Sequence, residues 1–298
     1  MKYSVKKMIS MVTMAAVAIS SFAFLKADAA VQTLSYVKYT YATNETSDYD
    51  LSLSDATTAM QQRAVIDEDE RKIGGINGVV RLVDSNFWRG TGFIVDDHVI
   101  ATAAHCVYDI DNHAWDSTDN FAPGLKIQMY NADGTPKNLY YNVDEVHILK
   151  SGYLNGTNGT IDYALLYVSE DLSEYPQFDL GITYNVNTSA FQNIDLFITG
   201  IPQYKPDENL NSQFYVYSGK GNATASTESM LHYTCDSSSG QSGSPVYTAV
   251  TYTVDNETYT TYTAVGVHSG SYSGSANRCA RMTAPRIQFY LSNPNIGS

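Results

Sequence analysis

Short runs of Val, Ile, Thr, Tyr and Phe recur along most of this chain, and Gly, Asn, Asp and Pro separate them. Runs of this length and spacing, with no helical periods between them, are typical of antiparallel β-sandwiches and barrels. Only the stretch 284–291 could form a helix, close to the end of the sequence. The expected strands are residues 79–83, 92–95, 99–101, 127–130, 143–149, 163–168, 195–199, 214–218, 230–234, 246–254 and 258–267.

The first 29 residues follow a different pattern. Lys2, Lys6 and Lys7 precede an apolar run, and Ala27 and Ala29 offer the small residues that a signal peptidase reads. A membrane anchor would need about 20 uninterrupted apolar residues, whereas serine and threonine interrupt this run. We therefore expect residues 1–29 to be a signal peptide, and the protein to be secreted to the extracellular space without a membrane association afterwards.

Residues 30–64 are polar, rich in Thr, Ser, Asp and Tyr, and contain no glycine. Such a segment can bury little apolar surface, so we expect it to be poorly ordered or an accessory to the main domain. Its position between a signal peptide and a dense β pattern predicts a pro-segment, with a flexible N-terminal extension as the alternative. Residues 65–298 are then enough for one unit of two packed barrels or for two small domains.

Composition narrows the possible functions. The chain carries 18 Lys and Arg against 31 Asp and Glu, with no basic patch interleaved with aromatic residues, which argues against nucleic-acid binding. Cys106, Cys235 and Cys279 lack the clustered Cys/His spacing of a zinc site, and no acidic calcium loop is present. We therefore predict no metal and no other cofactor. One of the three cysteines must stay unpaired within a monomer.

Candidate chemistry centres on Gly-Gln-Ser-Gly-Ser-Pro, residues 240–245. A serine flanked by glycines can expose its hydroxyl on a tight turn, where the backbone N–H groups of Gly240 and Ser242 can form an oxyanion hole for a substrate carbonyl. Ser244 is a rival nucleophile in the same stretch. Such turns are common in β proteins, so the motif gains weight only if a base and a carboxylate accompany it.

His105 and Asp162 are the candidates for that base and carboxylate. His105 follows an apolar strand and two small alanines, and Asp162 heads an otherwise apolar strand. A half-buried carboxylate beside an imidazole holds the correct tautomer and stabilises the imidazolium. Each residue alone could instead be an ordinary packed histidine or a turn aspartate. In the order His, Asp, Ser, the three together predict a catalytic triad of His105, Asp162 and Ser242.

These motifs carry a family resemblance. They resemble the chymotrypsin-fold serine proteases and, in detail, the bacterial glutamyl endopeptidases. The resemblance implies two six-stranded antiparallel Greek-key barrels, with a boundary near 180–190 and the active site in the cleft between them. It also implies a serine endopeptidase acting on polypeptide substrates. The matching stretches are Thr-Ala-Ala-His-Cys at 102–106, Asp-Tyr-Ala-Leu-Leu at 162–166, Gly-Gln-Ser-Gly-Ser-Pro-Val at 240–246, Val-Ile-Asp-Glu-Asp-Glu-Arg at 65–71, Gly-Ile-Pro at 200–202 and Val-Gly-Val-His at 265–268.

The same resemblance implies a substrate preference. In glutamyl endopeptidases a histidine at the position of His268 reads an acidic side chain, and Ser237 stands where a hydroxyl assists. An activating protease that removes the pro-segment would free an α-amino group at Val65, or one residue earlier, which would complete the pocket. Asp236 stands where trypsin-like enzymes hold the acid that binds Arg or Lys, so cleavage after basic residues stays an alternative, and His268 could be a packed strand histidine.

Two further expectations follow from the resemblance. A bridge between Cys235 and Cys279 would brace the pocket if their sulfur atoms are close enough, and Cys106 is expected to be a free, buried thiol. Domains of this fold can also serve as secreted binding modules or adhesins. Those usually lose a catalytic residue, whereas His105, Asp162 and Ser242 are all present here.

Overall fold

The computed structural model describes residues 32–53, 78–84, 88–109, 114–115, 124–154, 161–181, 195–202, 214–254, 256–273 and 276–291. The predicted signal peptide and the predicted mature start at Val65 lie outside these residues. Within them, no helix has the length and apolar character needed to cross a membrane.

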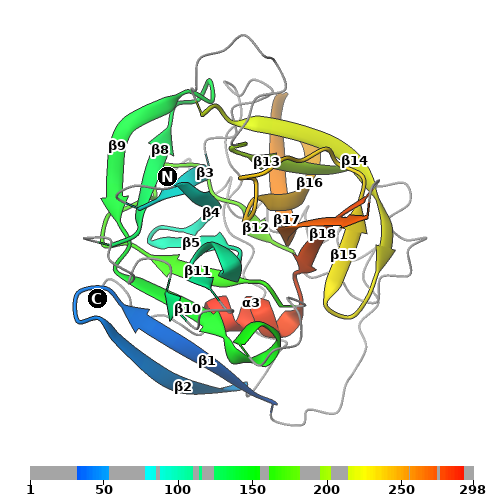
Figure 1. The fold of residues 1–298 in the computed structure, drawn as a ribbon. Helices are drawn as coiled ribbons and strands as arrows, with labels where there is room; N and C mark the ends of the chain where they lie inside the picture. The colour runs from blue at the N-terminus through cyan, green and yellow to red at the C-terminus, as the bar shows by residue number, and fades with distance from the viewer. Residues whose placement is uncertain are drawn as a thin grey trace.

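Two β-sheets account for most of the described chain, one from its first half and one from its second (Figure 1). The all-β architecture predicted from the sequence is confirmed. The first sheet contains β1 (Gln32–Thr40), β2 (Glu45–Leu53), β3 (Val79–Val83), β4 (Trp88–Asp96), β5 (Val99–Thr102), β8 (Lys126–Tyr130), β9 (Pro136–Asn142), β10 (Glu145–Leu149) and β11 (Ala164–Tyr167). The second contains β12 (Asp179–Leu180), β13 (Asp195–Gly200), β14 (Tyr217–Ser226), β15 (Met230–Tyr233), β16 (Pro245–Val254), β17 (Glu257–Ser273) and β18 (Ala276–Arg281). A small separate pair is formed by β6 (Tyr108–Asp109) and β7 (Ala114–Trp115).

In the first sheet the strands run in the order β2-β1-β10-β11-β5-β4-β3-β8-β9. All residues of the central strands β5 and β11 are buried, because both faces of the sheet are covered there. Such strands are mostly apolar in sequence rather than alternating. Ile100 of β5 lies opposite Ile94 of β4 and Leu166 of β11, and all three side chains are fully buried. This packing fixes the two strands that lead to His105 and Asp162.

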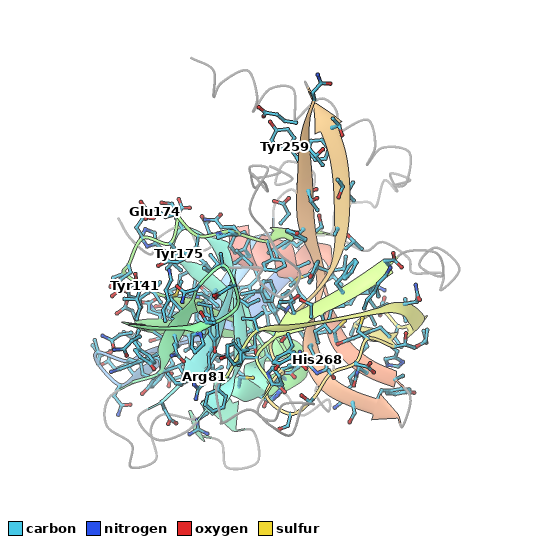
Figure 2. The ribbon with its side chains drawn as sticks, turned by 90° about the horizontal axis from the view of Figure 1, so that it is seen from above. Arg81, Tyr141, Glu174, Tyr175, Tyr259 and His268 are labelled. Carbon is cyan, nitrogen blue, oxygen red and sulfur yellow. The ribbon has the colours of Figure 1, made fainter. Side chains whose placement is uncertain are left out.

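The second sheet closes on itself. Its order is β12-β17-β16-β13-β14-β15-β18, and an additional pairing between β17 and β18 joins the ends of six strands into a barrel. Beyond this barrel β16 and β17 continue as a long hairpin. Figure 2 shows Tyr259 near the free end of that hairpin and His268 near the place where it enters the body of the protein.

The predicted C-terminal helix is confirmed at the predicted residues, as α3 (Ala284–Leu291). Phe289 is fully buried and packs against the first sheet. The hydroxyl of Tyr290 donates to the carbonyl of Val95 in β4 at 3.0 Å. The last helix of the chain therefore braces the first sheet, although it follows the second in sequence.

The N-terminal hairpin departs from expectation. Strands β1 and β2 pair along nine residues, and β1 pairs antiparallel with β10 from Tyr36 opposite Leu149 to Thr40 opposite Glu145. The prediction that residues 30–64 bury little is wrong here, because Tyr36, Val37 and Tyr39 are 8%, 8% and 3% exposed. Aromatic and β-branched side chains favour strands. The prediction used the composition of the whole segment, which is polar, and so overlooked these three residues.

Candidate active site

His105 lies in a single 3-10 turn, η1 (Ala104–Cys106), which directly follows β5. The two alanines before it are fully buried, and their small side chains leave space for the imidazole. The side chain of His105 is 36% exposed. The strand end therefore presents the ring to solvent on one side and to the protein on the other.

Asp162 is brought to this ring by strand pairing. Strands β11 and β5 are antiparallel, with Ala164 opposite Thr102, so the residues before β11 lie beside those after β5. His105 Nδ1 lies 2.6 Å from Asp162 Oδ2, and the backbone N–H of His105 donates to Asp162 Oδ1 at 2.9 Å. Asp162 is 4% exposed. Both carboxylate oxygens are thus committed to His105, which directs its Nδ1 proton toward Asp162 and leaves Nε2 to accept.

The surroundings of His105 shift its pKa. Burial lowers it, but the neighbouring Cys106 and the charge and hydrogen bond of Asp162 outweigh burial and raise the pKa well above the ordinary 6.5. Among the described residues the hydrogen-bond contacts of the His105 side chain are with Asp162 and with Cys106, whose Sγ lies 3.8 Å from Nε2. A hydrogen bond to Ser242 is not among them.

Ser242 sits on a turn that is pressed against the first sheet. Gly243, at φ 85°, is needed there, because a Cβ at this position would lie 2.1 Å from the carbonyl of Thr91 and 2.3 Å from the hydroxyl of Thr102. A Cβ at Gly90 would likewise meet both Cys106 Sγ and the Ser242 carbonyl. The serine turn and the histidine turn are therefore immediate neighbours across the two sheets.

Thr91 of β4 holds this turn in place. Its backbone N–H donates to the Ser242 carbonyl at 2.8 Å, and its hydroxyl donates to the Gly240 carbonyl at 3.0 Å. The same hydroxyl accepts from the backbone N–H of Ile201 at 3.1 Å. Thr91 is fully buried. Sequence reasoning missed this residue, because only the tertiary contact gives it a role.

Some backbone N–H groups of the turn donate hydrogen bonds and others do not. Gln241, Gly243 and Ser244 donate to Ser238, His268 and Gln241, respectively. The N–H groups of Gly240 and Ser242, in contrast, have no hydrogen-bond partner within the described part of the chain. Gly240 at φ 95° adopts a conformation that favours glycine. These two N–H groups can therefore both donate to one carbonyl oxygen of a bound molecule.

The two serines of the turn differ in access. Ser242 is partly exposed, whereas Ser244 is fully buried. Ser244 packs so closely on Gly200 that a Cβ there would lie 1.9 Å from Ser244 Oγ. A nucleophile must reach its substrate, and of the two hydroxyls only that of Ser242 can do so.

His268 lies on β17 next to the serine turn, since its backbone N–H donates to the Ser244 carbonyl at 2.9 Å. Its ring is 2% exposed, and Nδ1 lies 2.5 Å from the hydroxyl of Tyr233. Burial, assisted by the charge of His105, lowers the pKa of His268 to about 3, against opposing effects of Asp162 and a backbone hydrogen bond at Arg278. The ring is therefore neutral near pH 7. Sequence reasoning did not single out Tyr233.

The remaining predicted residues of the pocket lie between β15 and the serine turn. Ser237 is half-buried, and Asp236 is exposed. A carboxylate that binds a basic side chain through charge would be expected inside a pocket, where water screens it less. The exposed position of Asp236 does not match that expectation.

All three cysteines are free and buried. Cys106 is a free thiol, as predicted. The bridge considered between Cys235 and Cys279 is not formed, because Cys235 Sγ donates to the Leu196 carbonyl at 3.3 Å while Cys279 Sγ packs under Gly266. Burial raises the pKa of Cys235 to about 12. Within the described ranges, no group of three or more His, Cys, Asp or Glu side chains could hold a metal ion.

The chain is similar in sequence to known proteins. The sequence pattern of the trypsin-like peptidase domain matches residues 90–252, more than half of the 298-residue chain. The glutamyl endopeptidase of Bacillus licheniformis is 25% identical over 209 residues, which are 68% of this chain and 61% of that protein. An extracellular metalloprotease of Bacillus subtilis (strain 168) is 29% identical over 206 residues, 68% of this chain and 58% of that protein. The chain spans about three fifths of the length of these curated relatives.

A solved structure shares the fold. The structure of a Glu endopeptidase in complex with MPD superposes with a TM-score of 0.59 at 21% identity, covering 79% of this chain and 98% of that one. The predicted chymotrypsin-like fold class is thereby confirmed, and so is the resemblance to glutamyl endopeptidases read from the motifs. With a matching sequence pattern over most of both sheets and a matching fold, the chain belongs to the trypsin-like peptidase domain family.

Proposed function

We propose that the protein is a serine endopeptidase with Ser242 as nucleophile, His105 as general base and Asp162 as the residue that orients His105. The observation that carries this proposal is the 2.6 Å contact between His105 Nδ1 and Asp162 Oδ2, next to a serine turn with two free N–H groups. The similarity to a glutamyl endopeptidase supports it.

In the proposed reaction Ser242 Oγ attacks the carbonyl carbon of the scissile peptide bond while His105 Nε2 accepts its proton. The oxygen of the tetrahedral intermediate accepts hydrogen bonds from the N–H groups of Gly240 and Ser242. His105 then protonates the leaving amine, and an acyl-enzyme remains. Water, deprotonated by His105, attacks the acyl group and releases the product, while Asp162 stays ionised throughout.

We place cleavage after glutamate or aspartate. A neutral imidazole and a hydroxyl are hydrogen-bond donors for a carboxylate, and His268 and Ser237 supply these groups beside the serine turn. The α-amino group of Val65 would add a positive charge after processing. The alternative, cleavage after Arg or Lys, depends on Asp236, and the exposure of this residue weighs against it.

The same proposal covers location and maturation. The N-terminal pattern of residues 1–29 supports export, and one relative carries the name extracellular metalloprotease. We expect an activating protease to cut after Arg63 or Ala64, and the mature protein to act as a monomer. Sequencing the N-terminus of the chain that contains Ser242 in the secreted form tests this, since a fully active form in which that chain begins before residue 60 would contradict it.

Labelling with a serine-directed organophosphonate tests the proposed chemistry. We expect a covalent adduct on Ser242 in the wild type and in Ser244→Ala, and none in Ser242→Ala. Peptide hydrolysis should follow the same order. A correctly processed wild type that takes up no label would instead favour a secreted binding module or adhesin, the function from another class.

A further inference from the structure

We propose that the N-terminal hairpin formed by β1 and β2 stays bound to the first sheet after the chain is cut between Leu53 and Val65. The processed protein would then consist of two chains held together without a covalent bond. This inference concerns the assembly of the protein, so it does not depend on the proposed peptidase activity.

The backbone of β10 provides the first argument. One edge of β10 pairs with β11, and β1 occupies the other edge over five residue pairs. Tyr41 extends this contact, with its N–H donating to the Asp144 carbonyl at 3.0 Å. The far end of the sheet is β9, and the described strands form no ladder between β9 and β10 that would close the first sheet into a ring. Without the hairpin, β10 would be an unprotected edge strand, which readily pairs with other chains.

Aromatic packing provides the second argument. The ring of Tyr36 stacks on His147 of β10 at 5.4 Å and meets the edge of Phe289 of α3 at 5.1 Å. His147 is 2% exposed and Phe289 is fully buried. Loss of the hairpin would uncover both of these side chains to water. Because the hairpin keeps these apolar side chains out of water, their burial favours the complex in which the hairpin stays bound.

Charge pairs complete the interface and involve both strands of the hairpin. Lys38 of β1 lies 2.9 Å from Glu145 of β10, and Asp48 of β2 lies 2.7 Å from Lys150, which follows β10. Glu145 also contacts His147 Nε2 at 3.1 Å. Opposite charges across neighbouring strands help to fix the register. The hairpin therefore docks in one defined position rather than as a loosely collapsed tail.

Its location leaves the serine turn free. The turn contacts β4 and β5 through Thr91 and Thr102. In the sheet, two strands, β10 and β11, separate β1 from β5. Figure 1 shows the hairpin along the outer side of the first sheet, beside β10 and α3 and away from the second sheet. A retained hairpin would thus not obstruct a substrate at Ser242.

The test uses the full chain with Ser242→Ala, so that its outcome is independent of proteolytic activity. A recognition sequence for a site-specific protease is inserted after Leu53, the chain is cut to completion, and the product is passed through gel filtration at low micromolar concentration. Intact mass and denaturing gels identify the fragments. We expect the hairpin fragment to co-elute with the large fragment in a 1:1 ratio.

Two matched tyrosine variants identify the interface. Tyr36→Ser removes the ring that packs on His147 and Phe289, whereas Tyr49→Ser removes a ring of β2 that is 40% exposed. We expect Tyr36→Ser to lose at least about tenfold more of the hairpin fragment than Tyr49→Ser. Separate elution of the wild-type fragments, or equal loss from the two variants, would overturn the proposal.

If Tyr36→Ser does not fold, thermal unfolding of the chain with Tyr36 intact tests retention of the hairpin instead. The cut and uncut forms of the chain with intact Tyr36 are compared at equal concentration. A retained hairpin predicts that both melt at nearly the same temperature, with the cut form becoming less stable on dilution, as for any bound partner. A melting temperature of the cut form that is clearly lower and independent of concentration would contradict retention.

Discussion

The hydroxyl of Thr91, in the first sheet, lies 3.0 Å from the carbonyl of Gly240, in the second. By fixing the plane of this peptide, Thr91 also fixes the direction of the neighbouring N–H groups that would stabilise the oxyanion. The contact makes a threonine of one sheet responsible for the geometry of a turn in the other.

Replacing Thr91 by valine keeps the shape of the side chain and removes the hydroxyl. We expect kcat for peptide hydrolysis to fall on the order of 10- to 100-fold, because the proposed oxyanion donors lose their support. Stability should fall by about 1–3 kcal/mol, because the Gly240 carbonyl and the buried N–H of Ile201 lose a partner. Thr199→Val is the matched control. Thr199 is equally buried and bonded, to Ser218 and Tyr247, and its replacement should affect stability but not kcat.

Asp162→Asn should lower kcat by about 10⁴-fold with little change in fold, because an amide can no longer hold the His105 tautomer. Steady-state kinetics on a glutamyl peptide measures this. Asp236→Asn should leave the same activity within about twofold, since an exposed side chain at this site has little influence. Loss of activity in Asp236→Asn with Asp162→Asn unaffected would refute the assignment of roles.

The pKa of His105 predicts the pH dependence. Only the neutral imidazole can accept the Ser242 proton, and the pKa of this ring is raised above 6.5. Activity should therefore be lost as pH falls through a value above 6.5, and kcat/KM should rise with pH up to that point. In Asp162→Asn the midpoint of the residual activity should move to lower pH. A wild-type midpoint below 6.5 would contradict this account.

Tyr233→Phe tests the proposed role of His268 in substrate preference. Burial raises the pKa of the Tyr233 phenol, so it stays protonated and donates to His268 Nδ1. Without this donor the ring can turn or change tautomer, and we expect the preference for Glu over Gln before the cleaved bond to fall by about 10-fold. A peptide series with Glu, Asp, Gln, Arg and Lys at that position measures it. A wild-type preference for Arg or Lys would point to Asp236 instead.

Replacing Asp179 should change stability rather than catalysis. Burial raises the pKa of its carboxyl from 3.8 to about 7. Between these values the folded state binds more protons than the unfolded state, so this residue costs stability as pH rises through the window. Asp179→Asn should therefore raise the melting temperature at pH 8 relative to wild type, and do so much less at pH 5. Asp236→Asn, at an exposed site, should show no such difference.

The sequence allowed the central strands and the site motifs to be predicted for a physical reason. Strands such as β5 and β11 consist of apolar residues that are buried on both faces, and His105 and Asp162 directly adjoin them. Strand β9 and most of β14 escaped prediction. Their residues are Lys, Asn, Gly and Ala in large part, and pairing with β8 and β13 holds them in place rather than their own propensity.

Other features depend on contacts between distant segments, which a local pattern does not contain. Tyr233 meets His268 because β15 and β17 both pair with β18. Thr91 meets Gly240 across the two sheets, 149 positions away in sequence. The hairpin of β1 and β2 is buried through contacts of Tyr36 with β10 and α3, which its own composition does not reveal.

The close approach of Gly243 to Thr91 and Thr102 predicts how the proposed activity would be lost. In the proposed mechanism the base His105 and its partner Asp162 adjoin strands of the first sheet and Ser242 lies on a turn of the second, so the three side chains meet only while the two sheets keep their relative position. Mild denaturant or heat that shifts one sheet against the other should abolish turnover before the circular dichroism of the β-structure changes. Peptide hydrolysis would then report the relative position of the two sheets more sensitively than any spectroscopic measure of β-structure.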